Sequence, residues 1–175
     1  MRNPQLVRFV LVGLIGYVAW YTAYSAWLRP ATLLDEWVIH SMVVATEGFM
    51  DAIGWEVLPA METGLRHRVG VAGTPGVQIG DPCDGVVLFA LYALFLIAFP
   101  GPWRHKVWFI PAGIAVLHAV NIARVIALLF VQYAAPEWLQ FNHDYTFTVV
   151  VYAVVFGLWY AWVRWFALAK SPSTP

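Results

Sequence analysis

The chemistry that this sequence could support is concentrated in three side chains of different types. Cys83 is the only cysteine and lies in the segment GDPCDG, just before an apolar run. Arg124 lies inside another apolar run, in NIAR, and His143 opens the next run, in NHD. A thiol, a guanidinium and an imidazole that meet at one point can carry out nucleophilic acyl transfer. The elements around them must therefore bring three separate segments together.

The residues before Cys83 predict the start of a helix. Asp81 is suited to cap a helix and Pro82 to occupy its first position. Cys83 would then lie in the first turn, beside unpaired backbone N–H groups, and this location lowers the pKa of a thiol. Asp81 and Asp84 would oppose the effect by repulsion, so a nearby cation is expected. Taken alone, Cys83 is also compatible with an inert packing role.

Arg124 is predicted to lie well inside a membrane-spanning helix. It precedes Gln132, near the outer end of its run, by about 12 Å of helix. A charged side chain at such a depth is costly and usually functional, with snorkelling to the headgroups as the alternative. Asn121 can share the helix face of Arg124. His118 is interpreted as a hydrogen-bonded packing residue.

Composition indicates that the elements carrying these residues cross a membrane. Of the 175 residues, 61% are hydrophobic and 11% are charged, whereas a soluble domain has about 45–50% apolar and about 25% charged residues. The sequence predicts an all-α polytopic membrane protein with one domain, residues 1–175, and four transmembrane helices at about 7–28, 81–99, 106–134 and 145–168. A cleaved signal peptide is the alternative for the first span. The zero net charge argues against nucleic acid as a partner.

The distribution of charge predicts the orientation of these spans. All ten acidic residues fall on one side of the four-span arrangement. Six basic residues fall on the other side, namely Arg2, Arg8, Arg104, Lys106, Arg164 and Lys170. Because Lys and Arg mark the cytoplasmic side, both termini are expected in the cytoplasm and the protein in the cytoplasmic (inner) membrane.

Segments 29–80 and 135–144 then face outward. His143, next to Asp144, is expected in the second of these outer loops, where a histidine alone would be unremarkable. The topology, which follows from charge alone, nevertheless directs Cys83, Arg124 and His143 toward the same outer face.

The outer segment 29–80 has its own pattern. Apolar residues recur at helical spacing from Leu34 to Ile53, at Leu34, Val38, Met42, Ala45, Phe49 and Ile53, with most acidic residues on other faces. This pattern predicts an amphipathic helix that either lies in the outer interface or packs on the spans as a lid, and we prefer the lid. Residues 65–71 and 77–79 flank the turn GTPG and predict a small β-hairpin that leads to Cys83.

At these residues the chain resembles the exosortase/archaeosortase family, which consists of polytopic membrane enzymes with a Cys, Arg, His triad. The family's Cys-x-Gly is matched by Cys83 and Gly85, its Asn-x-x-Arg by Asn121 and Arg124, and its His-Asp by 143–144. The resemblance covers about residues 77–166, and the first span and the amphipathic segment match no motif. It implies that Cys83, Arg124 and His143 are catalytic, with Asn121, Asp144 and Gly85 in support.

The resemblance also implies a substrate and a reaction. The expected substrates are secreted proteins with a C-terminal tripartite tail, composed of a short motif, a hydrophobic span and basic residues. Cleavage near the motif would pass the new C-terminus, through a thioester, to a lipid or glycan acceptor. No metal or other cofactor is expected, because no motif for zinc, serine or nucleotide chemistry is present.

Two other classes of function remain open from the sequence. One is an assembly subunit of the membrane without chemistry, whose cysteine would be inert to thiol reagents. The other is a haem-binding membrane protein with His118 and His143 as axial ligands, which a Soret band would reveal.

Overall fold

The computed structural model describes residues 4–31, 33–63, 66–80 and 83–167. The first helical stretch comprises α1 (Pro4–Ala23), a π-helical turn (Tyr24–Leu28) and α2 (Arg29–Ala31). After it come α3 (Leu33–Ala52), strands β1 (Val57–Thr63), β2 (Arg66–Val71) and β3 (Val77–Ile79), then α4 (Val86–Ala98) and α5 (Trp103–Ala134). The last helical stretch comprises a 3₁₀ turn (Pro136–Trp138), α6 (Leu139–Phe141), a π-helical turn (Asn142–Thr146), α7 (Phe147–Trp162) and a second π-helical turn (Val163–Ala167).

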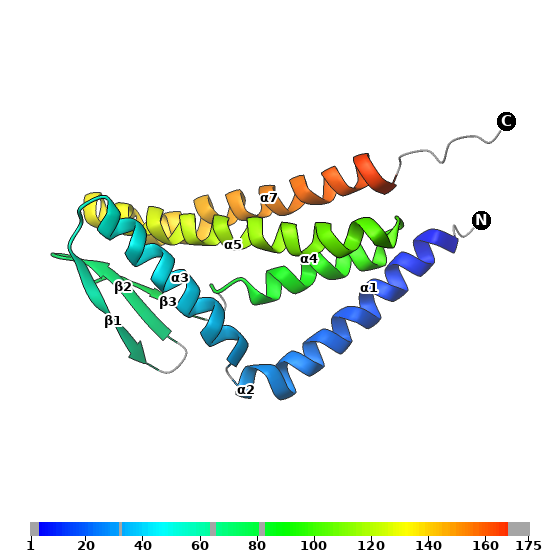
Figure 1. The fold of residues 1–175 in the computed structure, drawn as a ribbon, viewed down its shortest axis with the longest axis horizontal. Helices are drawn as coiled ribbons and strands as arrows, with labels where there is room; N and C mark the ends of the chain where they lie inside the picture. The colour runs from blue at the N-terminus through cyan, green and yellow to red at the C-terminus, as the bar shows by residue number, and fades with distance from the viewer. Residues whose placement is uncertain (1–3, 32, 64–65, 81–82, 168–175) are drawn as a thin grey trace.

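Apolar helices form an elongated bundle in which α4 packs against α1, α5 and α7. Among the described residues, three helical stretches are long and apolar enough to cross a membrane: Leu6–Ala31, Trp103–Ala134 and Pro136–Ala167. The predicted multi-pass membrane character is therefore confirmed. α4 is also apolar but shorter, so the number of spans stays a prediction. The start of α1, the α4–α5 turn and the end of the last helix lie together at one end of the molecule (Figure 1).

Two close contacts hold α4 on α5. The Tyr92 hydroxyl donates to the carbonyl of Phe109 at 3.1 Å, in a position that a side chain on Gly113 would occupy. Lys106 Nζ donates to the carbonyls of Ile97 (3.1 Å) and Phe99 (2.7 Å), which lie at the C-terminal end of α4. These contacts fix the position of α4 along the axis of α5, and hence the point beside α5 at which α4 begins.

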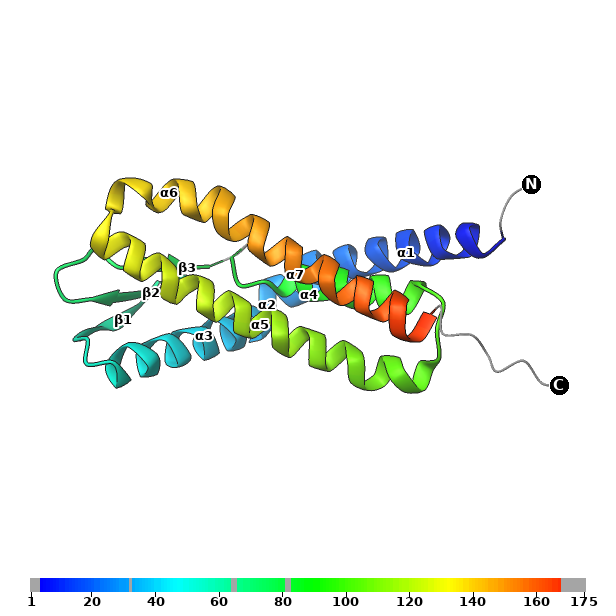
Figure 2. The ribbon, with the colours of Figure 1, turned by 90° about the horizontal axis from the view of Figure 1, so that it is seen from above.

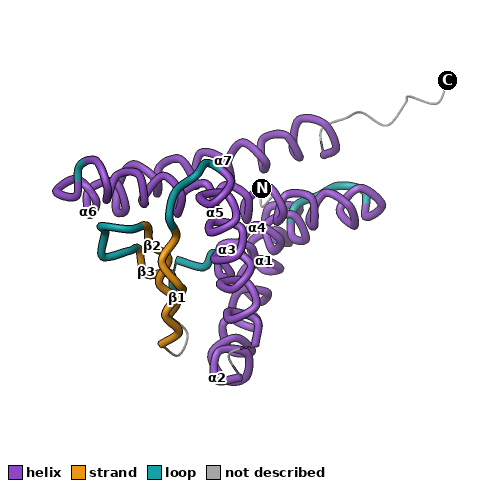
Figure 3. The backbone as a smooth tube through the Cα atoms, turned by 60° about the vertical axis from the view of Figure 1, so that its left-hand side comes forward, coloured by secondary structure: helices purple, strands orange, loops and turns teal. Residues whose placement is uncertain are grey.

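The opposite end of the molecule carries α3 and an antiparallel sheet with strand order β1-β2-β3. Figure 2 shows the sheet between α3 and α6, and Figure 3 shows the strands beside the helices. The predicted hairpin is confirmed as β2 and β3, with His67 opposite Ile79. β1 was not predicted because its sequence, VLPAMET, contains a proline and lacks clear alternation. The proline falls where the β1 register shifts, and such an irregularity accommodates it.

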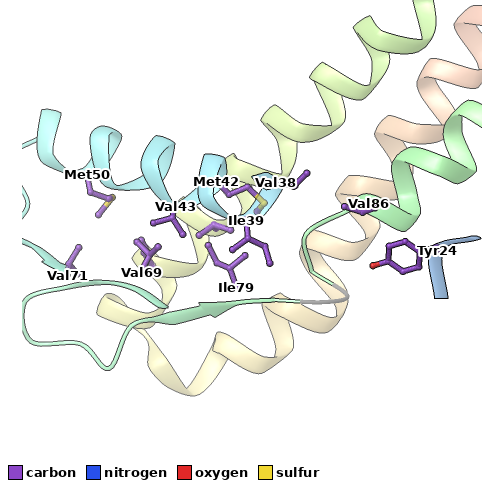
Figure 4. Close-up of a cluster of buried hydrophobic side chains, with 12 residues drawn as sticks. Tyr24, Val38, Ile39, Met42, Val43, Met50, Val69, Val71, Ile79 and Val86 are labelled. Atoms are coloured by element: carbon purple, nitrogen blue, oxygen red, sulfur yellow. The ribbon is translucent and has the colours of Figure 1, made fainter. Parts of the chain in front are cut away.

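The preferred interpretation of the amphipathic segment, a lid on the spans, agrees with the contacts of α3. This helix packs on α5 and on the sheet. Its buried side chains meet Val69, Val71 and Ile79 of the strands in the cluster of Figure 4. The predicted apolar stripe was partly wrong: Leu34, Phe49 and Ile53 are exposed. The buried apolar face consists of Val38, Ile39, Met42, Val43 and Met50. The difference arises because the sheet packs against α3 and buries residues on one side of the predicted stripe.

The acidic residues of this helix were expected mostly on faces away from the apolar stripe, but Asp35 is fully buried. The hydroxyl of Tyr24 donates to Asp35 Oδ1 at 2.9 Å. Because Tyr24 is in the π-helical turn that follows α1 and Asp35 is in the first turn of α3, this bond fixes the corner between the two helices.

Candidate active site

Cys83 lies in a tight turn immediately before α4. Its backbone N–H donates to the Gly80 carbonyl at 2.6 Å, and Asp84 Oδ1 accepts from the Val86 N–H at 3.0 Å. Gly85, with φ of +89°, is the residue that caps the helix. The prediction that Cys83 occupies the first helical turn is therefore wrong, because the left-handed Gly85 separates the thiol from the helix. The predicted capping roles of Asp81 and Pro82 lie outside the described residues.

Asn121 joins this turn to α5. Its Nδ2 donates to the carbonyls of Cys83 (2.9 Å) and Asp84 (3.0 Å), and the side chain is buried. One amide thus fixes two successive carbonyls of the Cys83 turn. Asn121 and Arg124 are one helical turn apart and both line the same cavity, so the predicted shared face is confirmed.

His143 faces the Cys83 thiol from the last helix. Its Nε2 lies 3.3 Å from Cys83 Sγ, and its Nδ1 lies 2.8 Å from Asp144 Oδ1. Because a carboxylate accepts, Nδ1 carries the proton and Nε2 is left free to accept from the thiol. Gln140 Nε2 donates to Asp144 Oδ2 at 2.6 Å and steadies the carboxylate. Thiol, imidazole and carboxylate are therefore arranged in series.

The predicted outer loop at 135–144 is wrong for most of its length. Only Ala135 separates α5 from the last helical stretch, and His143 lies in the π-helical turn Asn142–Thr146. No glycine or further proline interrupts the sequence between Pro136 and His143, and the contact between Gln140 and Asp144 supports helix across this stretch. A π-helical turn inserts an extra residue and shifts the side-chain directions around it.

Arg124 contacts the backbone of the same π-helical turn. Its Nη2 donates to the carbonyl of His143 at 3.3 Å. The same carbonyl accepts from Thr148 Oγ1 at 3.3 Å, a contact that sequence reasoning did not identify. Within the described part of the chain, Arg124 Nε is buried without a hydrogen-bond partner. The guanidinium as a whole is half-buried and lines the cavity beside Cys83, so its accessible part can donate to an acceptor oxygen that arrives with a substrate.

The charges around Cys83 act in opposite directions. Burial raises the pKa of the Cys83 thiol, Arg124 lowers it, and Asp84 and Asp144 raise it. The expected repulsion by Asp84 and the need for a cation are thus confirmed. The lowering expected from a place in the first helical turn is wrong, since the thiol precedes the helix and its burial raises the pKa. A protonated resting thiol requires a base, and His143 Nε2 is in contact with it.

A cavity of about 400 Å³ opens beside these side chains, between α4 and α7. One end is polar and contains Cys83, Asn121, Arg124, His143, Asp144 and Thr148. The rest is lined by Gly85, Val87, Leu88, Leu91, Val151 and Tyr152. A second, narrow cavity of about 20 Å³ is also lined by Cys83 and, in part, by β3.

His118, predicted as a packing residue, is one turn from Asn121 but outside both cavities. Its Nε2 lies 3.1 Å from Ser41 Oγ, which itself donates to the Val38 carbonyl. The imidazole therefore joins α5 to α3. No group of three or more His, Cys, Asp or Glu side chains in the described residues could hold a metal ion.

Replacing Asn121 with alanine is expected to destabilise the protein and to disorder the Cys83 turn. Two carbonyls lose their shared donor, and an unsatisfied buried polar group costs about 1–3 kcal/mol. Thermal unfolding in detergent should show the loss, and the rate of Cys83 alkylation should change with it. The control is Asn142→Ala, because Asn142 bonds only an exposed carbonyl, that of Trp138. Equal effects of the two substitutions would contradict this role.

Replacing Gly85 with alanine is expected to distort the same turn. The backbone has φ of +89°, and an added Cβ would lie 3.2 Å from both Asn121 Nδ2 and the Phe89 ring. The left-handed conformation alone costs an L-residue about 1–2 kcal/mol. Gly157→Ala is the matched control, since a Cβ there meets nothing within 4 Å. Unfolding temperatures should fall for Gly85→Ala and not for the control, and equal temperatures would contradict the expectation.

Comparison with known proteins adds one finding. A family model described as transmembrane exosortase matches residues 15–161, which include the second half of the first apolar helical stretch, α3, the sheet and all the side chains of the site. No curated protein and no solved structure gives a significant match.

Proposed function

Because this chain belongs to the transmembrane exosortase family, we propose that it is a membrane-embedded cysteine transpeptidase that removes C-terminal sorting tails from secreted proteins. The observation that carries the proposal is the 3.3 Å contact between Cys83 Sγ and His143 Nε2, with Asp144 behind the imidazole. A nucleophile, a base within hydrogen-bond reach and a group that orients the base are the requirements of covalent acyl transfer.

The proposed reaction begins with transfer of the thiol proton to His143 Nε2. Cys83 Sγ then forms a bond to the peptide carbonyl carbon, and the carbonyl electrons move to its oxygen. Arg124, which lines the cavity beside Cys83, stabilises this oxyanion, as preorganised donors do in acyl transfer. Collapse breaks the C–N bond, and His143 returns the proton to the leaving amine. The acyl group remains on sulfur as a thioester.

The second half of the reaction releases the thioester. A hydroxyl or amine of a lipid or glycan acceptor gives its proton to His143 and attacks the same carbonyl carbon. The C–S bond breaks and the thiolate regains a proton. Attack by water in place of the acceptor would make the enzyme a hydrolase, with the same residues in the same roles.

The proposed membrane position puts the site near the outer boundary of the hydrocarbon. Lys106 and Arg124 lie about 27 Å apart along α5, at about 1.5 Å per residue, and the hydrocarbon core is about 30 Å thick. With Lys106 at the cytoplasmic boundary, Arg124 reaches the outer one, a shallower position than the sequence had suggested for it. The remainder of α5, with α3 and the sheet, then projects outside. Both termini are cytoplasmic in this arrangement.

A search for uncleaved tails tests the proposed function before any substrate has been identified. Membranes from cells that express the wild-type chain or Cys83→Ala are compared by mass spectrometry of protein C-termini. We expect a set of secreted proteins to keep a tail with a hydrophobic segment only in the variant. Identical C-termini in the two samples would refute the proposal.

The two histidines of the bundle should differ sharply in this assay. His143→Ala removes both the base and the acid of the proposed reaction, and a positioned acid–base group contributes about 10²–10⁴-fold. His118→Ala removes the contacts with Ser41 and with the Phe89 ring, both of which lie outside the reacting groups, and should leave most of the activity. The measured quantity is the rate of tail removal at equal amounts of inserted protein. The opposite ranking would mean that the wrong histidine was assigned.

A further inference from the structure

The larger cavity beside Cys83 continues as a groove along α4 and α7. Away from its polar end the lining is apolar, at Val87, Leu88, Leu91, Val151 and Tyr152. Val87 and Leu91 are both 36% exposed and Tyr152 is 50% exposed, so the groove is open to the side of the bundle. In a membrane this side faces lipid, since both helices are apolar.

Cys83 lies where this groove meets the narrow cavity beside β3. Cys83, Asn121, Arg124 and His143 line both spaces. The narrow cavity is bounded by Val77, Gln78 and Ile79 of the strand. A polypeptide held at Cys83 therefore meets two different surroundings, the apolar groove along the helices and the strand β3 of the sheet. The space of about 20 Å³ beside the strand is too small to hold a residue, so a segment that continues toward the sheet must run over its surface.

The sheet and the groove suit the two segments that a peptide bond joins at the thiol, the one before the cleaved bond and the one after it. The segment before the bond stays on the thiol and must continue into a secreted domain, so it suits the side of the sheet. The segment after the bond leaves as an amine. If this segment is an apolar helix, the groove can cover it from its first residue onward, because hydrocarbon and the groove are similar environments for apolar side chains.

We propose that the groove between α4 and α7 is the subsite for the apolar helix that follows the cleaved bond, with the N-terminal end of that helix at Cys83. The proposal rests on the proposed function for its substrate. The occupant runs parallel to α4, from Cys83 toward the end of the molecule that carries the α4–α5 turn (Figure 1). It enters from the side, through the bilayer. The cavity of about 400 Å³ receives side chains from one face of the helix, and lipid covers the other face.

Reactive peptides test both the site and the direction. Two peptides share one apolar sequence of about 20 Leu and Ala residues followed by two lysines. The first carries a bromoacetyl group on its N-terminus and the second on its terminal lysine side chain. The Cys83 thiolate displaces bromide, so that an S–C bond forms and the C–Br bond breaks. The full-length protein is used in vesicles of phosphatidylethanolamine and phosphatidylglycerol, at one alkaline pH.

The N-terminal probe should label Cys83 at least about tenfold faster than the C-terminal probe, which corresponds to about 1.4 kcal/mol. Leu91→Trp fills the groove and should remove this advantage. The matched control is Val149→Trp, because Val149 is also on the outside of the bundle, 68% exposed, and is not part of the groove lining. Iodoacetamide, which needs no groove, should label all three proteins at similar rates.

Equal labelling by the two peptides would overturn the proposal, and so would equal effects of Leu91→Trp and Val149→Trp. A third reagent, bromoacetyl dodecylamide, represents a lipid chain. If Leu91→Trp slows the labelling of Cys83 by this reagent but not by the N-terminal peptide, the groove is a lipid site and the proposal is overturned. Alkylation needs no peptidase activity. Faster labelling by the N-terminal probe, in a protein that leaves every tail intact, would therefore support the groove as a helix-binding site while refuting the proposed function.

Discussion

Replacing Cys83 with alanine is expected to abolish tail cleavage while the protein still inserts and folds. The thiol is the proposed nucleophile, and its loss should lower the rate on the order of 10⁶-fold, as for the removal of a nucleophile from an acyl-transfer site. The thiol interacts with the side chains of His143 and Arg124, whereas the Asn121 bonds that fix the turn go to backbone carbonyls. The unfolding temperature in detergent should therefore change little. Cys83→Ser should be nearly as inactive, because a hydroxyl is a weaker nucleophile than a thiol.

The measurement for both variants is the fraction of each tailed protein that is shortened at equal enzyme levels. Val149→Ala serves as the control, since Val149 is exposed on α7 and outside the cavities. It should process tails at the wild-type rate. Complete processing by Cys83→Ala would eliminate covalent thiol catalysis.

Loss of Arg124 should give the second largest effect. Arg124→Ala removes the proposed oxyanion donor, and one such donor contributes about 10²–10³-fold in rate. It also removes the bond to the His143 carbonyl. Arg124→Lys keeps a charge but not the planar fork of donors, so it should recover only part of the activity. The control is Arg104→Lys, on the same helix but exposed at the opposite end.

Arg124 has a second effect that can be measured without a substrate. Its charge lowers the pKa of the Cys83 thiol and opposes burial, which raises that pKa. Removal of the guanidinium should therefore raise the pKa further. Since only the thiolate reacts, the alkylation rate of Arg124→Ala should rise with pH at higher values than in the wild type. Cys83 is the only cysteine, so every measured rate belongs to it. Coincident pH profiles would contradict this coupling.

The long apolar helices and the convergence of the three side chains could be predicted from the sequence. Composition and run length identify helices that cross a membrane, and the charge pattern directed Cys83, Arg124 and His143 to one face. The structure brings these residues together around one cavity. The motif residues Asn121 and Gly85 also lie in the site, for reasons that the sequence did not show. One holds two carbonyls, and the other adopts a left-handed conformation.

What could not be predicted depends on contacts between distant segments. The first turn of α4 is delayed to Val86 because Asn121, a residue of another helix, fixes the two carbonyls before it. His143 reaches the thiol from a π-helical turn, a feature without a sequence signal of its own. The rise in the Cys83 pKa comes from burial by segments that no local pattern identifies. Sequence patterns predict the secondary structure of each segment, whereas the geometry of the site depends on how distant segments pack together.

The most direct test of the central claim is detection of the acyl-enzyme. Excess protein in membranes is mixed with a tailed protein identified by the C-terminal comparison, the reaction is quenched with acid, and the peptide that contains Cys83 is analysed by mass spectrometry. We expect an adduct that forms before the transferred product, carries the new C-terminus of the shortened protein and is released by neutral hydroxylamine. Tail cleavage with Cys83 unmodified throughout, or an adduct that resists hydroxylamine, would contradict the central claim.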